Sequence, residues 1–249
     1  MTQDLFRQDA YLRQCPATVT AVTPQGIVLD RTVFYPLGGG QAGDAGMLVL
    51  ADGRSIAIAD TRKGKDAEGH PTADIVHVPA VDQDALLAEL APGTAVTAQV
   101  DWERRHRLMR FHTTTHLLCH LVPQLVNGCS ITPEYARLDF NMTDPLDKDA
   151  LTAGIARLVA ATHAVQVGEI SDAELDANPA LVKSMSVQPP RGSGKIRTIR
   201  IGGETLIDFQ PCGGTHVANT SEIGAVVVTK LEKKSATTRR VVLGFAAAT

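Results

Sequence analysis

The stretch ERRHRLMRFHTTTHLLCHLV, residues 103–122, decides the fold of this chain. It contains neither glycine nor proline, and Pro123 follows it directly. Its apolar residues recur at the three- and four-residue spacing of one helix face, at Leu108, Phe111, Leu117, Leu118, Leu121 and Val122. The pattern predicts one long helix that ends near Pro123.

The hundred residues before this helix have a different texture. Short β-branched runs alternate with turn signals such as Gly38-Gly39-Gly40 and Asp52-Gly53. The runs are Ala17–Val22, Gly26–Phe34, Gly46–Ala51, Asp74–Val78 and Thr94–Trp102. Several short strands at this spacing predict a small, glycine-rich β-barrel-like domain over residues 1–103. The polar residues 61–73 are expected to form a loop.

The residues after the long helix mix helix and strand patterns. Asp144-Pro145 and the capping box Ser171–Glu174 are typical helix starts. Strands are predicted at Arg137–Met142, Lys195–Ile201, Glu204–Phe209, Ile223–Lys230 and Arg239–Phe245. The fold class is therefore α+β, with a second domain over residues 104–249 that combines an antiparallel sheet with the long helix.

Composition limits the class of protein. Of 249 residues, 44% are hydrophobic and 20% charged, so the chain can bury a core and is not disordered. No apolar run approaches the roughly 18–20 residues that span a bilayer, and four unevenly spaced cysteines do not suggest a disulfide framework. We expect a cytoplasmic protein with no membrane contact. Without an evident coiled coil or apolar face, we also expect a monomer with no obligate protein partner.

Two pairs of residues have metal-ligand spacing. His112 and His116 lie four positions apart in the predicted helix, so both imidazoles leave one face. In the segment Cys212-Gly213-Gly214-Thr215-His216, two glycines let the chain turn and present Cys212 and His216 together. Either pair alone is weak evidence, but thiolate and imidazole together predict a zinc site. Thr113 stands where a zinc peptidase has its glutamate base, which argues against a peptidase.

Four segments in order carry a resemblance to a known family. They are Thr32–Pro36 with Gly38–Gln41 and Asp44–Gly46, then Arg110–His112 with Thr115–Leu118, then Arg137–Phe140, and last Asp208–Phe209 with Cys212–Val217 and Gly224. With them the chain resembles the AlaX family of free-standing alanyl-tRNA editing proteins, in particular its medium-length type, and the editing domain of alanyl-tRNA synthetase.

The resemblance implies an activity and its cofactor. The family cleaves the ester of mischarged tRNA(Ala), chiefly the seryl and also the glycyl form, and a chain without a synthetase core would do so in trans. His112, His116, Cys212 and His216 match the zinc ligands of the family.

The remaining site residues are assigned more loosely. Gln41 of the glycine-rich loop is expected to face the editing pocket. Thr32 is a candidate for recognising the serine hydroxyl, with an ordinary strand residue as the alternative. Of Thr113 and Thr115, one is expected in the pocket and the other bonded to its own helix; Thr115 is assigned to the pocket. Asp208 is a candidate to orient a ligating imidazole.

Phosphate contacts are predicted from charge. The formal net charge is −3, but basic residues gather between 230 and 240, which suits a limited contact with phosphates. Lys230, Arg239 and Arg240 are the candidates for binding the tRNA acceptor end, and a solvated strand face is the alternative. The stretch Lys233–Thr238 lacks the glycines that the family carries before its paired arginines.

Several readings of the function remain open from the sequence. Four protein ligands would close a zinc site, whereas hydrolysis needs a position for water or substrate. An RNA-binding module with a structural zinc is therefore one alternative to metal-assisted ester hydrolysis. Others are an editing enzyme for another tRNA and a hydrolase of small acyl esters.

Overall fold

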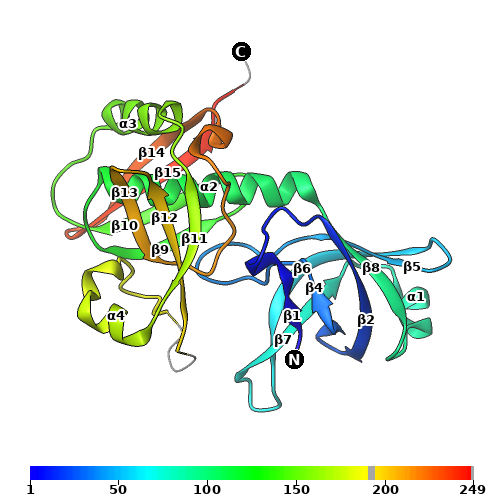
Figure 1. Cartoon of the computed structure of the whole chain (residues 1–249). Coiled ribbons are helices and arrows are strands. Elements are labelled where there is room, and N and C mark those ends of the chain that lie inside the picture. Colours follow the sequence, from blue (N-terminus) through cyan, green and yellow to red (C-terminus); the bar gives the residue numbers. More distant parts are fainter. Residues whose placement is uncertain (190–193, 248–249) are drawn as a thin grey trace. The chain divides into compact units, whose positions relative to one another are not determined.

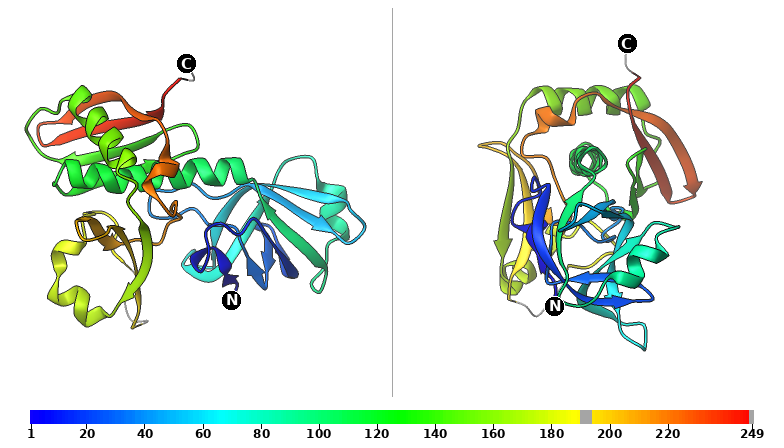
Figure 2. Two further views of the ribbon diagram at one scale, coloured as in Figure 1. Left: turned by 45° about the horizontal axis from the view of Figure 1, so that its top comes forward. Right: turned by 90° about the vertical axis from the view of Figure 1, so that its right-hand side faces the viewer.

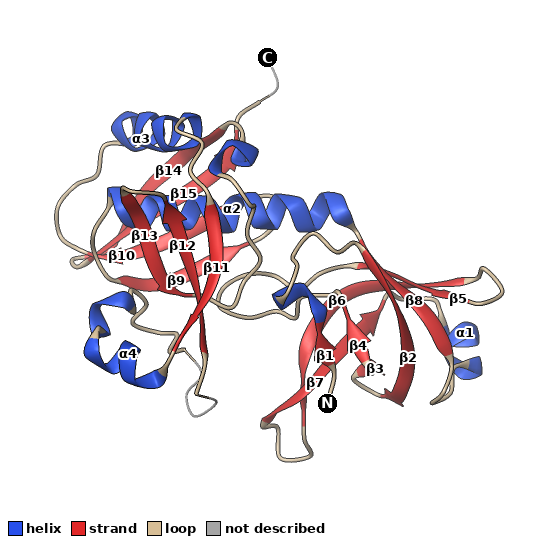
Figure 3. Ribbon diagram, viewed as in Figure 1, coloured by secondary structure: helices blue, strands red, loops and turns tan. Residues whose placement is uncertain are grey.

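The computed structural model describes residues 1–189 and 194–247, and the chain divides into two compact units. The first comprises Met1–Gly38 and Ala42–His106, and the second comprises Gly39–Gln41 and Arg107–Thr249. The expected α+β class is confirmed, since helices and antiparallel sheets occur together (Figures 1 and 3). None of the helices in the described residues is both long and apolar enough to cross a membrane.

Six antiparallel strands of the first unit close into a barrel in the order β2-β3-β7-β6-β5-β8. They are β2 (Gln14–Thr23), β3 (Gly26–Leu29), β5 (Gly46–Leu50), β6 (Ser55–Lys65), β7 (Pro71–Pro79) and β8 (Ala95–Val100). The barrel is filled by apolar side chains such as Ile27, Phe34, Leu48 and Ala98, each with no exposed surface. Short β1 (Gln3–Asp4) pairs in parallel with β4 (Arg31–Thr32), η1 (Leu5–Arg7) follows β1, and α1 (Asp84–Glu89) precedes β8.

The polar segment 61–73 is largely strand, which corrects the expected loop. β6 runs on to Lys65, and β7 begins at Pro71. Thr61 pairs with His77 and Lys63 with Ile75 in the antiparallel register. Cross-strand hydrogen bonding satisfies the backbone here, so the hairpin forms despite its polar side chains.

The base of the glycine-rich loop is held by a buried ion pair in the first unit. The Arg105 Nε atom donates to both carboxylate oxygens of Asp44 at 2.9 Å, and neither side chain is exposed. Asp44 also accepts the backbone N–H of Tyr35 at 2.6 Å, while the Asp44 N–H donates to Tyr35 O at 3.0 Å. The two ends of the loop between residues 35 and 44 are therefore fixed side by side.

In the second unit the long helix α2 (Trp102–Leu121) forms as predicted, with two sheets beside it. One sheet has the order β14-β15-β10-β9, from β14 (Val226–Ser235), β15 (Thr238–Phe245), β10 (Ala136–Asn141) and β9 (Val126–Ile131). The other consists of β11 (Val165–Ile170), β12 (Ile196–Gly202) and β13 (Leu206–Pro211). Residues 111–119 are all buried, and α2 is seen end-on between the sheets in the right-hand view of Figure 2.

Smaller helices complete this unit. α3 (Lys148–Ala160) packs against β14, and its N-cap is Asp147, whose carboxylate accepts the N–H groups of Asp149 and Ala150 at 2.9 Å. The helix therefore begins later than the predicted Asp144-Pro145 start. α4 (Asp172–Ala177) does begin with the predicted capping box, between Ser171 and Glu174. Two 3-10 turns, η2 (Pro179–Leu181) and η3 (Thr220–Ile223), complete the set of elements.

The loop Gly39–Gln41 packs within the second unit, against β9. The Ile131 N–H donates to Gly40 O at 2.7 Å, and Gln41 forms a parallel bridge with Ile131. Gly40 has φ +86°, and a Cβ there would lie 2.9 Å from Cys129 O, so only glycine allows this approach. The first unit thus ends at His106 and the second resumes at Arg107, inside α2. The domain boundary at 103–104 stays a prediction.

Candidate metal centre

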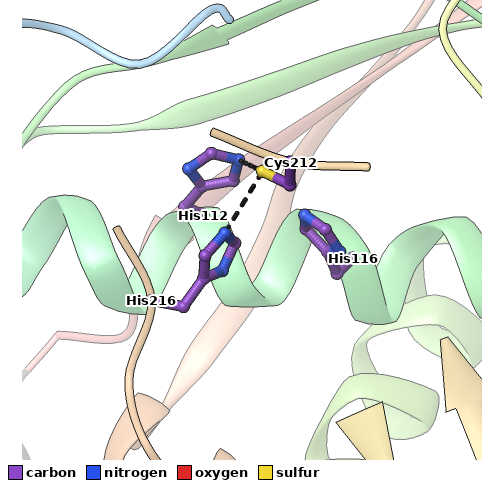
Figure 4. Close-up of side chains that lie close together, drawn as sticks. All are labelled: His112, His116, Cys212 and His216. Carbon is purple, nitrogen blue, oxygen red and sulfur yellow. Dashed lines mark hydrogen bonds between the residues drawn. The ribbon is translucent and has the colours of Figure 1, made fainter. Parts of the chain in front are cut away.

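Four side chains converge beside the middle of α2: His112, His116, Cys212 and His216 (Figure 4). One candidate ligand atom from each lies within 4.8 Å of all the others. The Cys212 Sγ atom lies 3.4 Å from His112 Nε2 and 3.3 Å from His216 Nε2. The two predicted pairs, about a hundred residues apart in sequence, therefore form one cluster that could hold a metal ion.

The spacing of these atoms suits a tetrahedral ion. With Zn–S near 2.3 Å and Zn–N near 2.0–2.1 Å, two ligands of one zinc ion lie roughly 3.5 Å apart. The observed S···N separations of 3.3 and 3.4 Å are close to that value. Nitrogen and sulfur donors are also the ones that zinc selects, so the residues present fit the ion.

Each of the three imidazoles is oriented through its Nδ1 atom. His112 Nδ1 lies 2.7 Å from Gln41 Oε1, and His116 Nδ1 lies 2.7 Å from Asp208 Oδ2. His216 Nδ1 lies 3.2 Å from the hydroxyl of Thr113. A partner at Nδ1 fixes the ring and leaves Nε2 as the ligand atom.

The Cys212 loop is shaped by an arginine and a glycine. β13 ends at Pro211, and the Arg197 Nη1 atom of β12 donates to Cys212 O at 2.7 Å and to Gly214 O at 3.0 Å. A Cβ on Gly214 would lie 2.1 Å from His112 Cε1, so a larger residue would displace that ring. Arg197 lies among basic residues, but nothing in the sequence marks it as a support of this loop.

The electrostatics of the cluster favour a cation at its centre. Burial would raise the pKa of Cys212, yet the charges of His112 and His216 lower it well below its usual value, towards the thiolate. Burial, with the charge of His112, lowers the pKa of His216, towards the neutral ring. Thiolate and neutral imidazole are the forms that bind a metal.

His116 faces most of the negative charge. Burial would lower its pKa, but Asp208 and Cys212 raise the pKa of His116 to about 9. Burial would raise the pKa of Asp208, whereas His116 and Lys183, which forms an ion pair with it, lower it to about 2. Thiolate and carboxylate thus attract positive charge at the cluster, which a proton on His116 or a metal ion can supply.

Two predicted pocket threonines have other contacts. The Thr115 hydroxyl donates to His112 O, one turn back, at 2.7 Å, and Thr113 instead contacts His216. Thr32 belongs to the first unit, where its hydroxyl lies 2.7 Å from His77 Nε2 and accepts the Phe34 N–H at 3.1 Å. The hydroxyls of Thr115 and Thr32, the two threonines predicted for the pocket, are therefore already bonded to protein groups.

Gln41 is brought to the cluster, as a support of His112. Its side chain is fully buried; besides His112, Oε1 accepts the Thr215 N–H at 3.1 Å, and Nε2 donates to the Thr215 hydroxyl at 2.8 Å. Asp208 takes the orienting position considered for it, against His116.

The three predicted tRNA-binding residues lie on the β14–β15 hairpin and have protein partners. Lys230 pairs with Glu232 at 2.7 Å. Arg240 binds both carboxylate oxygens of Asp139, at 2.7 and 2.8 Å. Arg239 donates to backbone oxygens, including that of Ser235 at 3.1 Å. Among the described contacts, none of the three touches the four clustered side chains.

Comparison with known proteins identifies the class. A model described as "Threonyl and Alanyl tRNA synthetase second additional domain" matches residues 196–242, and "tRNA synthetases class II (A)" matches residues 8–104. The chain is therefore related to the alanyl- and threonyl-tRNA synthetase group.

Individual relatives identify the family within this group. "Alanyl-tRNA editing protein AlaX-M" of Saccharolobus solfataricus is 32% identical over 245 residues, covering 97% of this chain and 98% of the relative. The protein of the same name from Methanosarcina barkeri is 33% identical over 248 residues, covering 96% and 97%. "Alanine--tRNA ligase" of Metallosphaera sedula is 33% identical over 240 residues, 93% of this chain but 25% of the ligase. The chain belongs to the AlaX-M family.

Proposed function

We propose that this protein removes the wrong amino acid from mischarged tRNA(Ala), acting on Ser-tRNA(Ala) and Gly-tRNA(Ala) as a free-standing editing hydrolase. AlaX editing proteins are deacylases that act on mischarged tRNA(Ala), and this chain matches them along nearly their whole length. The observation that carries the proposal is the His112–His116–Cys212–His216 cluster with an orienting partner at each imidazole.

The choice of substrate follows from the limits of binding selectivity. A pocket for alanine excludes serine poorly, because serine adds only one hydroxyl, and it cannot reject the smaller glycine by size. A second site that hydrolyses the wrong ester restores accuracy. We place this activity in the cytoplasm, where charged tRNA is used.

Zinc is the proposed cofactor, held by His112, His116, Cys212 and His216. When bound, the ion supplies a Lewis acid that can polarise the ester and a water molecule. Gln41, Asp208 and Thr113 act as positioning residues, since each contacts an imidazole and holds its Nε2 atom toward the centre. Because the other three ligands are buried, Cys212 marks the more accessible side of the cluster.

We assign the chemistry to the predicted domain over residues 104–249, with Gln41 contributed by the glycine-rich loop of the domain over residues 1–103. Thr32 is given a structural role in the barrel, because its hydroxyl is bonded on two sides. Lys230, Arg239 and Arg240 remain the proposed contacts for acceptor-end phosphates, with exposed Lys233 and Lys234 on the same hairpin.

The test is release of amino acid from Ser-, Gly- and Ala-tRNA(Ala) by the purified protein, with metal content measured in parallel. We expect rapid release of serine, sparing of alanine, and one equivalent of zinc. Cys212→Ala should lose both zinc and activity. The matched control is Cys15→Ala, which removes a buried thiol from the barrel.

Failure has a definite meaning. If the zinc-loaded protein releases no amino acid from any of the three substrates, the editing proposal is wrong. A zinc-stabilised RNA-binding module then becomes the better description.

A further inference from the structure

Two arginines of α2 lie together on the ring of Phe245, at the end of β15. The Cζ atom of Arg107 is 4.6 Å and that of Arg110 is 4.1 Å from the ring centroid. The same ring packs against Phe111, with 4.1 Å between ring centroids. Stacking of this kind holds a planar guanidinium group in one orientation.

Both guanidinium groups are also anchored through one nitrogen. Arg107 Nε donates to Pro133 O and Arg110 Nε donates to Ile223 O, each at 2.7 Å. Gly224 leaves room for Arg110, since a Cβ there would lie 3.0 Å from Arg110 Nη2. The Nε atoms are therefore bonded to backbone oxygens, whereas the hydrogen bonds found among residues 1–189 and 194–247 do not involve the Nη atoms of either arginine.

No carboxylate neutralises this pair in the part of the chain that the structure describes. The ion pairs found for residues 1–189 and 194–247 include neither arginine. Glu222, next to Ile223, accepts the N–H groups of Ala218 and Asn219. Two like charges fixed side by side repel each other, and a bound anion would remove that cost.

The pair lies on the other side of α2 from the metal cluster. Side chains advance by about 100° per residue around a helix, so Arg110 lies about 160° and Arg107 about 140° from His112. The arginines therefore do not face the reacting ester, and a ligand they bind is a different part of the substrate.

We propose that Arg107 and Arg110 form a phosphate-binding site that holds the tRNA backbone away from the editing centre. The proposal rests on the proposed function in taking tRNA as the ligand. Paired guanidinium forks match the oxygens of a phosphate, and contacts of this kind set the position of a nucleic acid without reading its sequence. Arg107 and Arg110 on α2 would then be a second group of phosphate contacts, in addition to the residues proposed on the β14–β15 hairpin.

The test is the salt dependence of binding to deacylated tRNA(Ala), which needs no hydrolysis. The observed binding constant falls as the salt concentration rises, and each phosphate contact contributes about 0.9 to the slope of the log–log plot, if the RNA duplex behaves as B-DNA does. Because the pair is proposed to hold one phosphate, Arg107→Gln/Arg110→Gln should lower the slope by roughly 1 and weaken binding on the order of tenfold. Arg157→Gln is the matched control, because Arg157 is exposed on α3 in the same unit.

Two further measurements guard against misfolding. Arg107→Lys/Arg110→Lys keeps both charges and should retain the slope. In the wild-type protein, tRNA should protect Arg107 and Arg110, more than Arg157, from an arginine-modifying dicarbonyl read by mass spectrometry. An unchanged slope in a folded double-glutamine variant, or no protection, overturns the proposal. Tight, arginine-dependent binding without hydrolysis would instead refute the proposed function and leave this site standing.

Discussion

The side-chain oxygen of Gln41 accepts a hydrogen bond from Nδ1 of His112, 2.7 Å away, although 71 positions separate the two residues. The same oxygen accepts the N–H of Thr215 at 3.1 Å. One buried amide thus ties the ligand-bearing helix to the ligand-bearing loop. We therefore propose that Gln41 acts on the candidate metal centre through His112, as a positioning residue.

Replacing Gln41 with methionine keeps the volume and removes the acceptor. We expect zinc affinity to fall by about 10–100-fold, the usual effect of losing a partner of a ligating histidine. Chelator competition measures the affinity. Gln166→Met, on exposed β11, is the matched control and should bind zinc as the wild type does. Equal affinity in the two variants would contradict the role given to Gln41.

The two threonines beside His112 provide a second comparison. Thr113→Val removes the hydroxyl next to His216, so we expect zinc affinity and kcat/KM to fall on the order of tenfold. Thr115→Val removes a bond to the carbonyl of its own helix, and we expect a smaller loss. Parallel metal titration and deacylation assays measure both. A larger loss for Thr115→Val would restore Thr115 as the pocket residue.

The buried histidine of the barrel predicts a pH dependence of stability. Burial lowers the pKa of His77 to about 4, although the hydrogen bond between Nδ1 and Ile27 O, at 3.0 Å, acts in the opposite direction. In the neutral ring, Nε2 can accept the Thr32 hydroxyl at 2.7 Å. In the unfolded chain this histidine binds a proton near pH 6.5. The contribution of the neutral, buried His77 to the free energy of unfolding is therefore fully present above pH 6.5 and is lost as the pH falls towards 4. The loss reaches roughly 3 kcal/mol once the pH is well below 4.

Denaturant unfolding, followed by the fluorescence of Trp102, measures this effect, since Trp102 is the sole tryptophan and belongs to the first unit. In His77→Asn, the free energy of unfolding should change less between pH 6.5 and pH 4 than in the wild type. His70→Asn, at an exposed position of the same unit, should keep the wild-type profile. Parallel profiles for His77→Asn and the wild type would rule out the assignment.

Arg240, a proposed contact for tRNA phosphates, should also stabilise the fold. Burial would raise the pKa of Asp139, but the hydrogen bonds and charge of Arg240 hold it below its usual value. Arg240→Gln leaves this carboxylate less satisfied, so the free energy of unfolding should fall by about 1–3 kcal/mol. Lys233→Gln, at an exposed position of β14, should leave stability unchanged. Thermal unfolding of both variants decides; an equal Tm for both would show that the Asp139 pair is not structural.

Local patterns predicted the long helix and pointed to the four candidate ligands, because each pattern repeats within a few residues. The apolar spacing identified α2, and ligand type together with glycine content identified the Cys212 loop. Helical phase alone could not choose between Thr113 and Thr115, because each is adjacent to one of the two helical histidines and the position of His216 decides. The hairpin of β6 and β7 was missed for a related reason, since cross-strand pairing outweighs the polar character of residues 61–65.

Contacts between distant segments were beyond such patterns. Nothing near Gln41 in the sequence indicates that its amide meets Thr215, 174 positions later, or that Lys183 pairs with Asp208. The family resemblance marked Gln41 as functional, but only the structure shows the atom that it contacts.

The passage of Gly39–Gln41 into the second unit limits how this protein can be divided. A fragment beginning at residue 104 would contain all four candidate ligands, yet His112 would have no amide to hold it. The half of the chain to which we assign the hydrolytic chemistry is therefore not a portable module. Gene fusion, truncation or transplantation into another protein preserves the centre only when the glycine-rich loop accompanies it, or when the host supplies an equivalent acceptor.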